Sequence, residues 1–274
     1  MQRYMLGIEY DGSRYCGWQR QKHCDSVQDN VERALGRVLD HDVEIQCAGR
    51  TDAGVHACDQ VVHFDTGAKR SRSGLVLGVN SYLPKDISIH WAATVASDFH
   101  ARFSALERRY RYLILNARAR SALFAKRAWV VHEPLDATLM QQGASALLGE
   151  HDFSAFRAAG CQAKHARRTI TALRVSRLQQ WVIIDIAANA FLQNMVRNVT
   201  GLLVAIGSSA RPVSDTAEVL ASKDRKTGGV TAPPQGLYLT RVVYPQESGV
   251  VSTELDDRQL PDRLPLLPIS TPME

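Results

Sequence analysis

The chain has 274 residues, of which 45% are hydrophobic and 22% charged, so it has enough apolar residues to bury a sizeable core. No run approaches the roughly 18 consecutive apolar residues that a membrane span needs. The segment Met1–Glu9 is interrupted too early to form a secretory hydrophobic region. We therefore expect a cytoplasmic, globular protein of one large domain or two fused smaller ones.

The charge is unevenly distributed along the chain. The net charge is +5, but six acidic and only two basic residues lie from Gln246 onward. The preceding 245 residues therefore hold 31 basic and 22 acidic residues, a net charge of +9. A basic body favours polyanionic partners, because each neutralised phosphate releases counterions. Many proteins without such partners are equally basic, so this feature alone does not assign a function.

The five cysteines are an odd number and form no CxxC pair, so we expect no disulfide framework. His56, Cys58, His63 and Asp65 lie close together in the sequence. Their spacing matches no standard zinc pattern, and we expect no metal site there.

Hydrophobic periodicity in the first 105 residues predicts the order β-α-β-β-α-β. Ser26 is a candidate N-cap, and Asp29, three residues later, stands where the acidic residue of a capping box lies. An apolar stripe at helical spacing begins at Val27. The expected strands are 3–10, 43–47, 60–64 and 87–95, and the expected helices are 27–39 and 75–82.

The same order recurs in residues 106–245. The expected strands are 109–115, 169–176, 181–187 and 237–244, and the expected helices are 137–148 and 191–206. This predicts an α+β protein with two ferredoxin-like halves, 1–105 and 106–245, joined into one extended antiparallel sheet. Helices would cover one face and the other would form a long cleft. Residues 246–274 are acidic and proline-rich, and we expect a flexible or docked tail.

The segment that points to chemistry is Ala48–Ala57, AGRTDAGVHA, between two expected strands. Gly49 and Gly54 bracket Arg50 and Asp52 and allow a tight turn close to a ligand. In isolation this sequence is typical of an ordinary turn. A phosphate-binding loop is disfavoured, because no lysine follows the second glycine and no helix begins there.

Several further motifs accompany this loop in order along the chain. They are YDGS at 10–13, GWQRQ at 17–21, NSYLPKDI at 80–87, FHARFSA at 99–105, RYRY at 109–112, FLQNMVR at 191–197 and TAPPQGL at 231–237. Together, over residues 4–244, they resemble the tRNA pseudouridine synthase A (TruA) family. The resemblance implies the doubled ferredoxin-like fold with an RNA-binding cleft. It also implies a homodimer without metal or organic cofactor that isomerises uridines at positions 38, 39 and 40 of the tRNA anticodon stem-loop.

The resemblance assigns catalytic roles to three residues. Asp52 is the catalytic carboxylate, which an ordinary pKa of about 3.9 would leave ionised at neutral pH. Attack on the ribose, attack on the uracil and removal of a sugar proton are all open roles for it. Arg197, on the polar side of its expected helix, is the partner that offsets burial of the carboxylate. Tyr110 packs on the flipped base and assists loss of the C5 proton.

Substrate binding is expected to involve Arg50 and Thr51 beside Asp52, with Arg50 contacting the target phosphate or filling the space left by the base. Trp18 is expected in the core. The tRNA surface is expected to include basic residues from both halves: Arg14, Arg20, Lys22, Lys69, Arg70, Arg72, Arg102, Lys164, Arg167 and Arg168.

Three other functions are compatible with parts of this sequence. A pseudouridine synthase acting on a different RNA stays open, because shape and backbone contacts choose the RNA. A non-catalytic tRNA-binding module would have no need of Asp52, Tyr110 and Arg197 together. A metal-dependent hydrolase using His56 and His63 would be inhibited by chelators.

Overall fold

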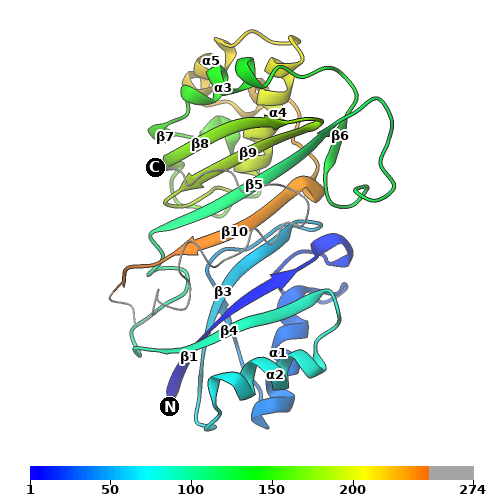
Figure 1. Cartoon of the computed structure of the whole chain (residues 1–274). Helices are drawn as coiled ribbons and strands as arrows, with labels where there is room; N and C mark the ends of the chain where they lie inside the picture. The colour runs from blue at the N-terminus through cyan, green and yellow to red at the C-terminus, as the bar shows by residue number, and fades with distance from the viewer. Residues whose placement is uncertain (247–274) are drawn as a thin grey trace. The chain divides into compact units, whose positions relative to one another are not determined.

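The computed structural model describes residues 1–246, and the expected tail lies, apart from Gln246, outside the described residues (Figure 1). The chain divides into two compact units. One contains Met1–Leu106 together with the segment that begins at Leu239, and the other contains Glu107–Tyr238. Both units combine helices with mostly antiparallel strands, so the predicted α+β class is confirmed.

The first unit contains β1 (Gln2–Tyr10), α1 (Val27–Leu39), β2 (Gln46–Cys47), β3 (His56–Thr66), α2 (Arg72–Tyr82) and β4 (Ile87–Val95). Its strands follow the order β4-β1-β3, with β2 paired to β3 and β10 (Leu237–Val243) next to β3. Figure 1 shows α1 and α2 packed beside each other against this sheet. The predicted element order is confirmed here.

Helix α1 forms as its sequence predicts. The Ser26 hydroxyl accepts a hydrogen bond from the Asp29 N–H at 3.3 Å, which satisfies one of the unpaired donors of the first turn. Val27, Val31 and Leu35 follow at helical spacing and are fully buried. The helix ends at Asp40, whose left-handed backbone (φ 60°) cannot continue it.

The second unit contains β5 (Glu107–Asn116), β6 (Trp129–Val131), α3 (Ala137–Ser145), β7 (Gly149–Asp152), β8 (Arg167–Leu178), β9 (Trp181–Ala188), α4 (Met195–Gly207) and α5 (Asp215–Ser222). Its strand order is β5-β9-β8-β7, antiparallel throughout, with β6 parallel to β5. Helix α3 packs against β8 and α4, and Figure 1 shows α3, α4 and α5 gathered in one part of this unit.

Several boundaries differ from the predictions for physical reasons. The helix expected at 191–206 begins only at Met195, because Asn194 adopts a left-handed backbone (φ 62°). The helix expected at 137–148 ends at Ser145. Only Gln46–Cys47 of the expected strand 43–47 pairs with β3. Short β6, β7 and α5 were not foreseen, since they lack a clear period.

The expectation for the cysteines is wrong at one pair. A disulfide joins Cys16 to Cys24, whose Cα atoms are 6.2 Å apart, while Cys47, Cys58 and Cys161 are unpaired thiols. Pairing depends on the turn of the 16–24 segment, which spacing alone does not reveal. None of the helices in residues 1–246 has the length and apolar character needed to span a bilayer.

Candidate active site

The loop that carries Asp52 connects β2 to β3 and is anchored at its start. The Ala48 N–H donates to the Val61 carbonyl at 2.8 Å, and the Gln60 side-chain amide donates to the Gly49 carbonyl at 2.6 Å. Within the loop, the Val55 N–H donates to the Asp52 carbonyl at 3.1 Å. This hydrogen bond closes a turn over residues 52–55, in which Gly54 is the third residue. Gly54 has φ 77°, a backbone conformation that glycine adopts without strain.

A second segment, residues 10–18, holds the same loop from the other side. The Trp18 N–H donates to the Thr51 carbonyl at 3.0 Å, and the Gly54 N–H donates to the Tyr15 carbonyl at 3.4 Å. Gly17 has φ 97°, and a Cβ atom there would lie 2.6 Å from the Thr51 carbonyl oxygen. Two glycine-containing motifs of the sequence therefore fit closely against each other.

The loop presents its side chains in different environments. Thr51 is buried, Asp52 is half-buried and Arg50 is exposed. Burial raises the pKa of the neighbouring Cys47 thiol to about 11, although the charges of Arg50 and Arg102 oppose that rise. Asp52 itself lies on a loop held by backbone hydrogen bonds, and its side chain keeps access to solvent.

Tyr110 lies in the second unit, on β5. Tyr110 and Tyr112 are buried, and Arg111, which alternates with them along the strand, is also buried and forms an ion pair with Asp185 of β9 at 2.7 Å. The Tyr110 ring packs edge-on against Phe191, with centroids 5.1 Å apart. Because Phe191 precedes α4, this contact ties the tyrosine to the segment that leads to Arg197.

Arg197, on α4, is half-buried and has a defined orientation. Its Nε donates to the Ala232 carbonyl at 2.7 Å and its Nη1 to the Asn194 side-chain oxygen at 3.0 Å. The Ala232 N–H donates back to the Arg197 carbonyl at 3.0 Å. The side of α4 predicted to be polar is thus covered by the 230–232 segment, and Thr200 and Gly201 on it are buried.

Tyr112 connects this region to the TAPPQGL motif. Its hydroxyl donates to the Pro233 carbonyl at 2.6 Å. Burial raises the pKa of Tyr112 far above its ordinary value, and the charge of Arg197 partly opposes the rise. A Cβ atom on Gly236 would lie 2.6 Å from the Tyr112 ring, so glycine is required there. The motif therefore packs on the strand of Tyr110 and the helix of Arg197.

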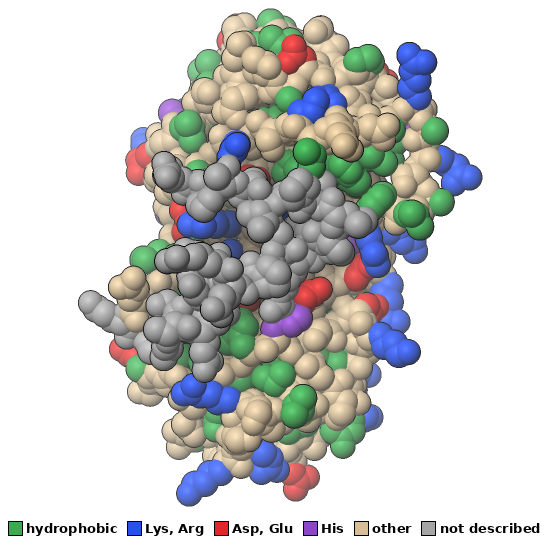
Figure 2. Space-filling model, viewed as in Figure 1, with side chains coloured by type: hydrophobic (Ala, Val, Ile, Leu, Met, Phe, Trp, Pro, Cys, Tyr) green, Lys and Arg blue, Asp and Glu red, His purple; other side chains and the backbone are tan. Residues whose placement is uncertain are grey.

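The predicted basic residues divide between the units. Lys164, Arg167 and Arg168 lie in the second unit, and the others, Arg14, Arg20, Lys22, Lys69, Arg70, Arg72 and Arg102, lie in the first. Arg14 pairs with Asp86 at 2.6 Å, and Arg20 pairs with Asp29 and Glu32. Burial lowers the pKa of Arg168. Figure 2 shows Lys and Arg side chains on both units, interspersed with acidic and hydrophobic ones.

Three of the four residues considered for a metal have separate partners. His56 Nδ1 lies 3.2 Å from a carboxylate oxygen of Asp11, and His63 Nδ1 accepts from the Ala101 N–H at 3.1 Å. Asp65 pairs with Arg3 at 2.6 Å. Within residues 1–246, no three His, Cys, Asp or Glu side chains are grouped so as to hold a metal ion.

The sequence patterns did not identify the buried residues that support the Asp52 loop. The Tyr10 hydroxyl lies 2.7 Å from the Thr51 hydroxyl, buried below the loop. Glu32 of α1 is a buried carboxylate in an otherwise ordinary amphipathic helix. Its position on the buried side of the predicted helix was a signal, since an unpaired charge is rarely placed there. Trp18 is in the core, as predicted.

Known proteins with similar sequences identify the family of this chain. A family model described as tRNA pseudouridine synthase matches residues 7–104 and 144–245. The chain is 53% identical to tRNA pseudouridine synthase A of Aeromonas hydrophila, covering 96% of this chain and 98% of that protein. It is 52% identical to the protein of the same name in Pseudoalteromonas atlantica, covering 89% and 93% respectively.

Another relative of that name, in Coxiella burnetii, is 53% identical over 89% of this chain and 94% of its own. Among solved structures, one titled as an H/ACA RNP bound to a substrate RNA containing 2'-deoxyuridine has 10% identity and a TM-score of 0.35. It covers 73% of this chain and 44% of that one, a similarity too low to support an argument. On the family model and the relatives, the chain belongs to the tRNA pseudouridine synthase family, of the TruA type, and is an isomerase.

Proposed function

We propose that this enzyme converts uridine to pseudouridine at positions 38, 39 and 40 of the tRNA anticodon stem-loop, with Asp52 as its catalytic carboxylate. The observation that carries the proposal is the loop itself. Its backbone is fixed by hydrogen bonds from β3 and from the 10–18 segment, while the Asp52 side chain stays half-exposed. The relatives that share half of the sequence over nearly the whole chain are all named tRNA pseudouridine synthase A.

The reaction breaks the bond between uracil N1 and ribose C1′ and forms one between C5 and C1′. The proton on C5 is lost and N1 gains a proton, so atoms and electrons balance without an external oxidant, reductant or energy source. The base leaves the stack and rotates in a pocket before it is rejoined. Asp52 acts beside the sugar and the base, as an ionised carboxylate.

Two residues of the second unit complete the proposed site. Arg197 offsets the desolvation of Asp52 when the substrate excludes water, and its contacts with Ala232 and Asn194 pre-set its orientation. Tyr110 provides an aromatic surface for the flipped base, and Phe191 supports its ring. Arg50 and Thr51 lie beside the carboxylate, and the exposed Arg50 contacts the target phosphate or fills the space that the flipped base leaves.

We further propose that residues 1–105 and 106–245 act as two ferredoxin-like halves that share one sheet and one RNA-binding cleft. The basic side chains on both units favour a partner that reaches both. We also propose that the protein functions as a homodimer in the cytoplasm.

The test is a direct assay. Purified protein is incubated with unmodified tRNA carrying uridines at 38–40, in EDTA, and pseudouridine is mapped by chemical labelling. Wild type and Asp98→Ala, a change at an exposed aspartate, should form product at those positions, and Asp52→Asn should form none. Product at other positions would overturn the substrate assignment. Tight tRNA binding without product would favour a binding module.

A further inference from the structure

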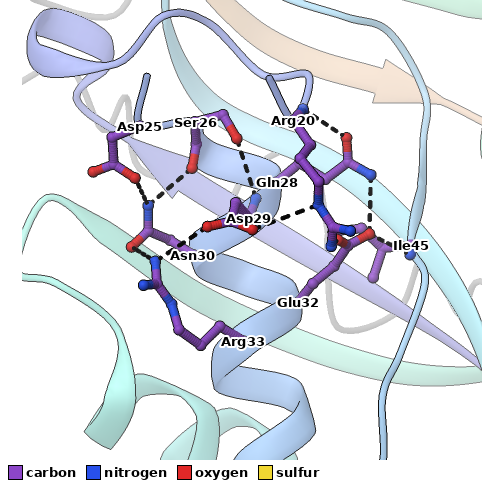
Figure 3. Close-up of polar contacts among 9 residues, drawn as sticks. All are labelled: Arg20, Asp25, Ser26, Gln28, Asp29, Asn30, Glu32, Arg33 and Ile45. Atoms are coloured by element: carbon purple, nitrogen blue, oxygen red, sulfur yellow. Dashed lines mark hydrogen bonds and ion pairs between the residues drawn. The ribbon is translucent and has the colours of Figure 1, made fainter. Parts of the chain in front are cut away.

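A buried carboxylate lies at the centre of a polar cluster on the N-terminal half of α1 (Figure 3). The Glu32 side chain is only 4% exposed. Moving a carboxylate out of water costs several kcal/mol unless charged and hydrogen-bonding groups surround it. The partners of this carboxylate therefore show what its burial serves.

These partners come from three separate pieces of the chain. One carboxylate oxygen accepts from the Gln28 side-chain amide at 2.9 Å and from the Ile45 N–H at 3.0 Å. The other forms an ion pair with Arg20 Nη2. A single side chain thus joins α1, the 17–20 segment and the segment that enters β2, as the dashed lines in Figure 3 show.

Gln28 doubles the connection to the 17–20 segment. Its side-chain oxygen accepts from the Arg20 N–H at 3.1 Å, and its backbone N–H donates to the Trp18 carbonyl at 3.0 Å. Trp18 in turn donates its own N–H to the Thr51 carbonyl at 3.0 Å, one residue before Asp52. This path leads from Glu32 to the Asp52 loop in three steps.

The second path runs through the other end of the loop. Ile45, held by Glu32, is buried and is followed directly by β2 and then by Ala48, where the loop is anchored to Val61. One carboxylate therefore fixes both the chain that enters the loop and the segment that holds its middle.

An exposed acidic residue on the same helix gives a contrast. Asp29 lies 3.5 Å from Arg20 Nε and 3.4 Å from Arg33, with 46% of its side chain exposed. Neither of these two arginines lies on the segment that enters β2, and exposed pairs of this kind contribute little. The arginine has two acidic neighbours, but only the buried one connects to both paths.

We propose that Glu32 is a positioning residue for Asp52, acting through Arg20, Gln28 and Ile45 on both sides of the catalytic loop. The inference rests on the proposed catalytic role of Asp52. Glu32 meets no substrate; its carboxylate keeps the Asp52 backbone where the reaction needs it. Loss of its charge should therefore slow the chemical step and leave tRNA affinity unchanged.

The test is Glu32→Gln. The glutamine keeps the shape of the side chain but replaces one carboxylate oxygen with an NH₂ group. That group would face a donor whose hydrogen bond the oxygen accepted. We expect kcat to fall at least tenfold, while KM for tRNA stays within twofold. Gln28→Met, a milder change, should lower kcat about threefold in the same way. Asp29→Asn, the matched control on the same arginine, should leave both constants within twofold.

A second control separates positioning from stability. Leu75→Ala removes a fully buried side chain from α2, away from the loop, and should lower the melting temperature with kcat unchanged well below melting. If Glu32→Gln lowers kcat no more than Leu75→Ala does, the carboxylate is only structural and the inference fails. A rise in KM alone would also overturn it, since that result places the cluster in tRNA binding.

Hydrogen–deuterium exchange provides a readout that does not depend on activity. Glu32→Gln should speed exchange in peptides covering 48–55 and 17–20, whereas Asp29→Asn should not. Unchanged exchange in 48–55 would overturn the inference. If the wild type itself forms no pseudouridine, the proposed function fails, and the exchange result alone decides whether Glu32 holds the loop.

Discussion

The hydroxyls of Tyr10 and Thr51 lie 2.7 Å apart in the core of the first unit, and Thr51 is the residue that directly precedes Asp52. Tyr10 ends β1 and is 2% exposed, and its ring packs against Trp18 with centroids 5.9 Å apart. The first strand of the fold therefore supports the loop through a side chain, while Trp18 holds the same threonine by its backbone. Both contacts fix Thr51, so the position of Asp52 depends on them jointly.

We predict that Tyr10→Phe lowers kcat severalfold with little change in KM for tRNA. The change removes only the hydroxyl and leaves the buried Thr51 hydroxyl without this partner, which costs about 1 to 3 kcal/mol. Chemical denaturation and steady-state kinetics measure the two effects. The matched control is Tyr4→Phe, also on β1. It removes a hydroxyl that donates to the Gln2 side chain and to the Arg70 carbonyl, and it should leave kcat unchanged. Equal kinetics in the two variants would show that the Tyr10 contact does not position the loop.

The helix of Arg197 gives a second prediction. A Cβ atom at Gly201 would lie 1.8 Å from the Val230 carbonyl oxygen, so an alanine there must push the 230–232 segment away from α4. That segment contains Ala232, whose carbonyl accepts from Arg197 Nε and whose N–H donates to the Arg197 carbonyl. We predict that Gly201→Ala destabilises the protein by about 1 to 3 kcal/mol and lowers kcat.

Thermal melting and kinetics test this against Gly36→Ala in α1. There the nearest atom to the new Cβ would be the His41 carbonyl oxygen at 3.4 Å. The helix accommodates this alanine, and we expect stabilisation of up to about 1 kcal/mol. A Gly201→Ala protein as stable and as active as the wild type would mean that α4 and the 230–232 segment do not need close contact.

The sequence was most informative where local signals agree. Ser26 and the stripe that follows it predict α1 correctly, and Ile87–Val95 forms the strand that alternation predicts. The start of α4 was placed four residues early, since apolar spacing continues through 191–194 while Asn194 adopts a left-handed backbone. Periodicity does not report a single unusual φ angle.

For the candidate site, the motifs located Asp52 but not its supports. Tyr10 and Thr51 are 41 residues apart, and Glu32 and Ile45 are joined only after α1 folds back on the sheet. Such contacts depend on tertiary packing, which local patterns do not contain. Arg197, which the sequence places on the polar side of its helix, is held by Ala232, because that face of α4 is covered by a distant segment.

The cysteines give a third prediction. The disulfide between Cys16 and Cys24 closes a loop with a sequence separation of 8 that contains Trp18 and Arg20. Closing a loop of this length restricts the unfolded chain and should stabilise the protein by about 2 to 3 kcal/mol. We predict three titratable thiols in the denatured protein before reduction and five after it, with a lower melting temperature once reduced.

The double variant Cys16→Ser/Cys24→Ser is the control. It should titrate as three thiols under both conditions, and its melting temperature should not respond to reductant. Five thiols in the unreduced wild-type protein would show that the pair is not oxidised in solution, and the expected stabilisation would then be absent.

The last prediction concerns the dependence of stability on pH. Burial, together with the nearby charges of His100 and Arg3, lowers the pKa of His63 to about 4. In the unfolded chain the pKa returns to about 6.5, so between pH 4 and 6.5 the unfolded state binds more protons. Stability should therefore be lost as the pH falls from 6.5 towards 4, by about 1 to 2 kcal/mol from this residue, since screening reduces the full effect.

Comparison with His63→Asn isolates this effect from the protonation of carboxylates. The Asn side-chain oxygen can accept the hydrogen bond that Nδ1 receives from the Ala101 N–H at 3.1 Å, and it has no proton to gain in this range. The free energy of unfolding, measured with urea at pH 7 and pH 4.5, should fall less in His63→Asn than in the wild type. His100, whose ring centroid is 4.6 Å from that of His63, also has a lowered pKa, so His100→Asn should show a smaller shift in the same direction. Parallel losses in all three proteins would mean that His63 is protonated in the folded state, and burial against Phe99 and His100 would then not keep the ring neutral.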